Sequence, residues 1–157
     1  MNTSRAVLAG VLGGVVMSIL MALGRAVLGM ETNLEMLMGT TLLGEGAAAW
    51  LLGLGMHLAL SGLVALAYTW GFEALTRRAS AALGAAFGVL HIAVAGVAMG
   101  AVVPLVHRWV PEQTPGPGYF LTNHGALGAA AFVVLHLVFG AVVGALYAGH
   151  VRAAAAA

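Results

Sequence analysis

The chain has 157 residues, of which 62% are hydrophobic and only 7% are charged, and its formal net charge at pH 7 is +1. A soluble globular chain carries about a quarter charged residues, so there are too few charges here to cover an aqueous surface. The absence of Cys, Asp and Lys excludes disulfide, thiolate, iron–sulfur and lysine Schiff-base chemistry. The small net charge offers nothing for nucleic acid to bind. We expect the lipid bilayer to be the solvent.

Four apolar runs are long enough to cross a hydrocarbon core of about 30 Å, which takes about 20 helical residues. They are residues 6–28, 47–72, 80–106 and 125–149. The predicted fold is therefore an all-α, four-transmembrane-helix bundle, and residues 1–157 form a single transmembrane domain. The breaks between the runs are marked by glutamates, by Arg77 and Arg78, and by a Pro- and Gly-rich segment at 111–118.

A short amphipathic helix is predicted in the first outer loop. Thr32 and Glu35 have capping-box spacing, and apolar side chains follow at helical intervals until Gly44. We expect residues 33–43 to lie on the outer membrane surface or to fold over the end of the bundle. Three methionines of this segment are either flexible apolar filler, which we favour, or soft ligands for copper. They are Met30, Met36 and Met38.

The ends of the runs carry capping and anchoring residues. Ser80 before the third run and Asn123 before the fourth are predicted helix N-caps. Aromatic residues near the ends of the runs are predicted to form belts at the two membrane interfaces. The outer belt is Trp50, Trp109, Tyr119 and Phe120, and the inner belt is Tyr68, Trp70 and Tyr147.

The sequence contains an internal repeat. The second and fourth runs match at equal offsets from a histidine, in the pairs His57 and His136, Leu58 and Leu137, Ser61 and Gly140, Val64 and Val143, Tyr68 and Tyr147. The first and third runs match in the pairs Gly10 and Gly84, Gly14 and Gly88, Met17 and His91. The predicted unit is a helical hairpin used twice, at residues 6–72 and 80–149. Since each hairpin returns to its starting side, the two copies are expected to be parallel, related by an axis along the membrane normal.

Small residues at helical spacing mark the faces that we expect to pack. Lipid tails are as apolar as leucine, so membrane helices associate through close approach of their backbones, which glycine permits. The predicted helix-packing residues are Gly10, Gly14, Gly84, Gly88 and Gly140. His91 lies on the same stripe as Gly84 and Gly88 and is therefore expected to point into the bundle.

The arginines predict the orientation, because cytoplasmic loops carry an excess of basic residues. Four arginines lie on one side of the predicted spans and two on the other. The first set is Arg5, Arg77, Arg78 and Arg152, and the second is Arg25 and Arg108. Both termini are therefore expected in the cytoplasm.

Three histidines are predicted to lie in one layer near the membrane midplane. At a rise of 1.5 Å per residue, His57 lies about 15 Å and His136 about 16 Å from the outer ends of their helices, and His91 about 17 Å from the inner end. Met17 falls in the same layer. An ionisable residue at that depth is costly and needs a partner or a task.

Three interpretations of this layer stay open. In the first, which we favour, neutral histidines form hydrogen bonds with neighbouring groups and fix the helix register. In the second, His57, His91 and His136, with Met17, bind copper or zinc or serve as axial ligands to haem b. In the third, they line a polar track for a proton or a small solute.

Short motifs spread over nearly the whole chain point to one family. They are Gly10-x3-Gly14-x2-Met17, Met38-Gly39-Thr40 to Gly44, His57 with Tyr68, Pro104, Gly118-Tyr119-Phe120, and His136 to Tyr147. In these motifs the chain resembles an uncharacterised family of small bacterial four-helix integral membrane proteins, a domain of unknown function. The resemblance implies a multi-pass protein of the bacterial cytoplasmic (inner) membrane, and it implies no activity and no catalytic residues.

The expected function is non-enzymatic. There is no nucleophile motif and no carboxylate deep in a predicted span, so we assign no catalytic residue. We expect a structural or accessory subunit whose glycine faces join other membrane proteins or a second copy of the chain. The alternatives are a haem- or metal-binding protein for electron transfer or metal handling, and a small transporter.

Overall fold

A computed structural model describes residues 1–107 and 116–155, and it describes side chains within them up to residue 106 and from 116 to 151. In this part of the chain the elements are helical, and four are long: α1 (Thr3–Leu28), α3 (Ala47–Gly71), α4 (Ala81–Ala101) and α6 (Gly125–Ala155). Alone or with their short continuations, these four are long and apolar enough to cross a membrane. The predicted all-α fold with four such helices is confirmed for the described residues. Arg108, Trp109 and the segment 111–115 lie outside them.

Four short elements complete the described chain. They are the helix α2 (Leu34–Gly39), the π-helix η1 (Phe72–Thr76), the helix α5 (Val103–His107) and the 3₁₀-helix η2 (Tyr119–His124). The extent of the third predicted span, 80–106, is confirmed, since Ala81–Val106 is long and apolar enough to cross a membrane, but its helix has a break: α4 ends at Ala101 and α5 begins at Val103. Pro104 explains the interruption, because it lacks the N–H that would continue the helical hydrogen bonds.

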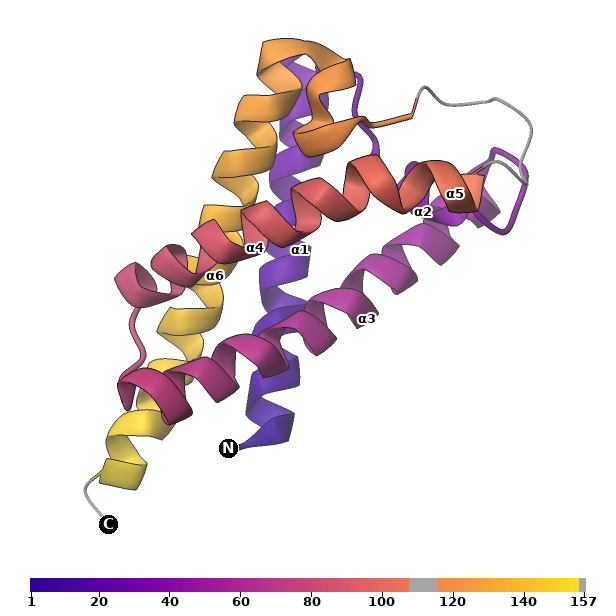
Figure 1. The fold of residues 1–157 in the computed structure, drawn as a ribbon. Coiled ribbons are helices and arrows are strands. Elements are labelled where there is room, and N and C mark those ends of the chain that lie inside the picture. Colours follow the sequence, from indigo (N-terminus) through magenta and orange to yellow (C-terminus); the bar gives the residue numbers. More distant parts are fainter. Residues whose placement is uncertain (108–115, 156–157) are drawn as a thin grey trace.

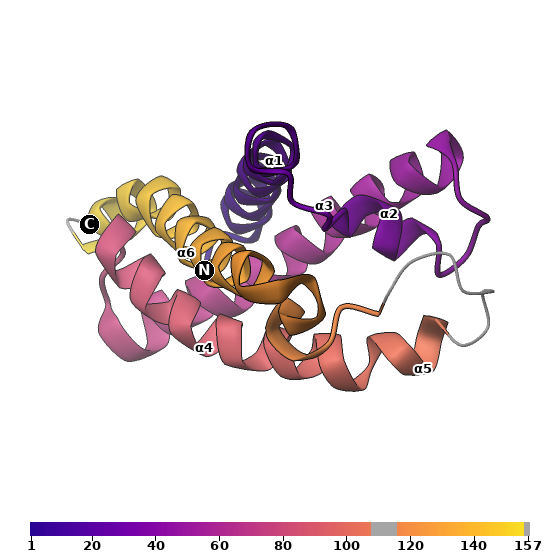
Figure 2. The ribbon, with the colours of Figure 1, turned by 90° about the horizontal axis from the view of Figure 1, so that it is seen from above.

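The long helices form two hairpins that lie side by side (Figure 1, Figure 2). α1 packs along α3, α4 packs along α6, and the contact between α1 and α6 joins the two hairpins. The backbones of α3 and α4, although consecutive in the chain, stay apart along most of their length. The start of α1 and the ends of α3 and α6 lie at the same end of the bundle (Figure 1). Both hairpins therefore start and finish at one end.

Close backbone approach occurs at the predicted glycines. A Cβ added to Gly10 would overlap the Ser61 carbonyl oxygen of α3, and one added to Gly84 would overlap the Gly140 carbonyl oxygen of α6. The contacts one turn further on differ in kind. A Cβ on Gly14 would lie 2.6 Å from the side-chain oxygen of Ser61, whereas one on Gly88 would lie 3.0 Å from the backbone carbonyl oxygen of His136. Close backbone contact of the same kind is thus seen at Gly10 and Gly84.

The helix starts follow ordinary capping chemistry, with two corrections. The Ser80 side chain accepts a hydrogen bond from the Leu83 N–H at 3.1 Å, as an N-cap does. The N-cap of α2 is Asn33, which accepts from the Met36 N–H, so the predicted capping box at Thr32 is wrong by one residue. The predicted N-cap at Asn123 is also wrong, because Asn123 lies inside η2 and its side-chain amide donates to the Gly116 carbonyl.

The predicted helix of the first loop is present, but it is shorter than residues 33–43. α2 packs closely on α3: a Cβ on Gly39 would overlap the Ala49 backbone, and one on Gly53 would overlap the Glu35 carbonyl. Of the two predicted positions, the structure therefore shows α2 folded over the end of the bundle.

Two tyrosines predicted for the inner belt belong to the core instead. Tyr68 is 4% exposed and Tyr147 is fully buried, and both pack in the central apolar cluster with Phe72 and Phe139. Each hydroxyl has a polar partner, which makes burial of a tyrosine possible. The Tyr147 hydroxyl donates to Glu73 Oε1 at 2.5 Å and links α6 to η1. The anchoring role predicted for these two tyrosines is therefore wrong.

Candidate membrane-embedded cavity

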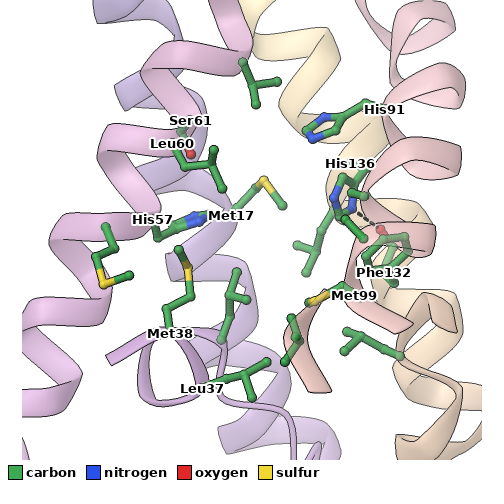
Figure 3. Close-up of a pocket in the computed structure, with 18 of the residues that line it drawn as sticks. Met17, Leu37, Met38, His57, Leu60, Ser61, His91, Met99, Phe132 and His136 are labelled. Carbon is green, nitrogen blue, oxygen red and sulfur yellow. Dashed lines mark hydrogen bonds between the residues drawn. The ribbon is translucent and has the colours of Figure 1, made fainter. Parts of the chain in front are cut away.

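A cavity of about 480 Å³ lies between the two hairpins, bounded by the halves of α3 and α4 nearer to α2 and α5 and closed at the end by α2 and α5. The walls are mainly aliphatic and aromatic side chains. The three histidines of the predicted layer and Met17 all line this one cavity (Figure 3). Five of the eight methionines of the chain also line it. They are Met17, Met21, Met38, Met56 and Met99.

His57 is fixed by the backbone of α1. Its Nε2 lies 3.3 Å from the Gly14 carbonyl oxygen, and the residue is only 6% exposed. A carbonyl oxygen only accepts hydrogen bonds, so the neutral imidazole carries its hydrogen on Nε2. Gly14 allows this approach because it has no side chain. The Nδ1 of His57 is then left as an acceptor.

His136 is fixed by its own helix. Its Nδ1 lies 2.7 Å from the carbonyl oxygen of Phe132, one turn earlier in α6. By the same argument Nδ1 carries the hydrogen and Nε2 is left as an acceptor. The His57 and His136 rings approach the cavity from opposite sides (Figure 3).

His91 is held by Tyr68 across the gap between α3 and α4. The Tyr68 hydroxyl and His91 Nδ1 are 3.2 Å apart. The imidazole of His91 also lies edge to face with that of His136, with the ring centroids 4.6 Å apart and the planes at 77°. Tyr68 was expected at an interface, and sequence reasoning therefore missed it as a partner of the histidine layer.

The three histidines share a cavity wall but do not surround one point. Among the described residues, no group of three or more His, Cys, Asp or Glu side chains is placed to hold one metal ion. A zinc ion needs ligand nitrogens about 2.0–2.1 Å away. His57 and His136 each use one nitrogen for a backbone carbonyl, and His91 uses one for Tyr68. The backbone carbonyl partners of His57 and His136 are of the kind expected in the interpretation that we favoured, whereas the partner of His91 is not.

A buried charged cluster beside α2 was not predicted. Glu35 is 1% exposed, and its Oε2 lies 3.7 Å from Arg25 Nη1. The same Arg25 nitrogen donates to the Thr32 carbonyl oxygen at 3.3 Å. The position of Arg25 inside the first apolar run was the sequence signal for this pair, since a charge there requires a partner.

No match to the chain is found. This holds for the comparison with protein-family models, with curated proteins and with solved structures. The resemblance to the small four-helix family stays a prediction, and the function has to be argued from the cavity.

Proposed function

We propose that the chain is a membrane protein that binds a lipid-soluble small molecule in the cavity between its two hairpins. The observation that carries this proposal is the cavity itself. Its volume of about 480 Å³ is within the range of about 300–1,000 Å³ typical of small-molecule sites. Such sites combine apolar walls with a few polar groups, and here the polar groups are three imidazoles and the hydroxyls of Thr41 and Ser61. A purely structural or accessory subunit requires no such cavity.

The ligand is proposed to enter from the lipid between α3 and α4. Near their connected ends, these helices touch through aromatic side chains, with the ring centroids of Tyr68 of α3 and Phe87 of α4 6.1 Å apart. Beyond this contact their backbones stay apart, and the cavity begins there. Exposed apolar side chains of α4 such as Val94 flank this opening and suit contact with lipid.

The proposal places the chain in the bacterial inner membrane with both termini in the cytoplasm. Four apolar helices and the arginine asymmetry support it. The equivalent contacts at Gly10 and Gly84 support the proposed parallel repeat. A superposition that pairs His57 with His136 only through an axis in the membrane plane would contradict the repeat.

Reporter fusions test the orientation. Fusions at Arg78 and Arg152 are expected to report a cytoplasmic location, and fusions at Thr40 and Gln113 an external one, because arginine-rich loops stay inside. Alkaline phosphatase and a fluorescent protein serve as the paired reporters. An external location at Arg152 would show that the chain is inverted or has an odd number of spans.

Filling the cavity tests the binding function. Ala98 of α4 lines the cavity, so Ala98→Phe is expected to occupy part of it and to weaken binding at least about tenfold. The measurement is titration of the fluorescent apolar probe 1-aminoanthracene into nanodiscs that contain the protein, with the signal of empty nanodiscs subtracted. The wild-type protein is expected to give a saturable component.

The matched control is Ala93→Phe, the same change at an exposed position of α4 that does not line the cavity. It is expected to keep the saturable component at wild-type affinity. Equal binding by both variants, or no saturable component in the wild-type protein, would overturn the proposed function. Circular dichroism of both variants shows whether each one is folded.

One observation favours a second candidate function, the handling of a soft metal ion. Five methionine thioethers and three imidazoles line the same cavity, and such ligands select Cu(I). Metal analysis of the same purified samples after incubation with Cu(I) distinguishes the two candidates. Stoichiometric copper that is lost in a Met17→Leu variant would favour metal handling, and no bound copper would remove that candidate.

A further inference from the structure

We infer that the ligand has a phenolic head group, as in a hydroquinone, and that it donates hydrogen bonds to the histidines. This inference rests on the proposed function and specifies the chemistry of the ligand. The inference depends on which nitrogen of each imidazole is hydrogen-bonded within the protein and which nitrogen is left for a ligand.

The three imidazoles of the cavity offer more acceptors than donors. The Gly14 carbonyl takes the hydrogen of His57, and the Phe132 carbonyl takes that of His136. In the neutral imidazoles, His57 Nδ1 and His136 Nε2 are then acceptors, and no residue in the described part of the chain donates to either. An acceptor in an apolar cavity that lacks a donor forgoes a hydrogen bond, so a ligand that supplies O–H groups binds more favourably than one that supplies only oxygens.

Tyr68 determines the role of the third histidine. Its hydroxyl has one hydrogen, and the hydrogen-bond partner described for it is His91 Nδ1. Because buried hydroxyl hydrogens are nearly always used, Tyr68 donates to Nδ1 and His91 carries its own hydrogen on Nε2. The histidines thus supply two acceptors and one donor, which is the arrangement that suits a hydroxyl-bearing head.

Aromatic rings and thioethers surround these nitrogens. The Phe132 ring lies 4.1 Å from the His136 ring, and the Phe139 ring lies 5.5 Å from that of His91, measured between centroids. Met17 and Met99 line the cavity beside them. Aromatic rings pack well against such edges and against sulfur, so a planar aromatic head fits here better than a sugar or a phosphate. Its apolar tail would leave between α3 and α4.

Competition with three related probes tests the inference on the unaltered protein. Decylhydroquinone, its dimethyl ether and the corresponding quinone share a ring and a tail, but only the hydroquinone donates hydrogen bonds. Each compound is titrated under anaerobic conditions against 1-aminoanthracene bound to nanodiscs that contain the protein, and the displacement of 1-aminoanthracene is measured. We expect the hydroquinone to compete about tenfold more strongly than the other two.

The variants His57→Leu and His136→Leu locate the effect. Each is expected to reduce hydroquinone affinity about tenfold more than it reduces the affinity for the dimethyl ether, and circular dichroism shows whether each variant is folded. If all three probes compete equally, or if none displaces 1-aminoanthracene, the inference of a phenolic head group is wrong. In that case saturable binding of 1-aminoanthracene still supports ligand binding in the cavity. Absence of saturable probe binding would overturn the proposed function itself.

Discussion

Gly84→Ala is expected to lower the free energy of unfolding by at least about 2 kcal/mol, although alanine is the better helix former. The added Cβ would overlap the Gly140 carbonyl oxygen, and it would lie 2.7 Å from the carbonyl carbon and 3.1 Å from the Gly144 Cα. All three neighbours are backbone atoms of α6, so no side chain can rotate away. The two helices would have to separate along their shared face.

The control for this prediction is Gly55→Ala. Gly55 lies on an exposed position of α3, and a Cβ there would meet no atom within 4 Å. This change is expected to stabilise the helix by up to about 1 kcal/mol. Denaturant titration in mild detergent, followed by circular dichroism, measures both variants. A Gly84→Ala protein as stable as the wild type would show that the α4–α6 contact is looser than described.

Arg25→Leu is expected to cost about 3 kcal/mol of stability, because it leaves the Glu35 carboxylate buried without its basic partner. Breaking a buried ion pair typically costs about 3–5 kcal/mol. We expect the lower end of that range, since a quarter of the Arg25 side chain remains exposed. The same unfolding titration measures the loss.

The double variant Arg25→Leu with Glu35→Leu separates loss of the pair from loss of packing. Replacing both charges by apolar groups of similar size is often close to neutral, so most of the stability is expected to return. If the double variant is less stable than Arg25→Leu alone, the Glu35 carboxylate is stabilised by something other than Arg25.

The long helices were predictable because the number of residues needed to cross an apolar layer is fixed by helix geometry. The prediction failed where a local interaction determined the boundary. The helix of the third run has a break near Pro104 that was not predicted, although the bounds of the run were, and Asn33 replaces Thr32 as the cap of α2 because its side chain reaches the Met36 N–H. Residue types restrict such boundaries, but only the backbone geometry decides between adjacent candidates.

The histidine layer was predictable from depth, because the helical rise converts position in a run into distance along it. His57, His91 and His136 line one cavity as that depth suggested. The cavity itself was not predictable, because it depends on how far α3 and α4 diverge, which sequence periodicity does not specify. Tyr68 was misplaced because it lies close to the end of its run, where aromatic residues often mark an interface.

The contact between α1 and α6 has a consequence for the order of events during synthesis. Gly13 of α1 packs against Phe139 and Val143 of α6, so of the four long helices the one that is synthesised first pairs with the one that is synthesised last. The first hairpin is complete once residue 71 has been made, but its partner surface does not exist until more than 60 further residues have followed. The contact between the two hairpins can therefore form only after α6 has been synthesised.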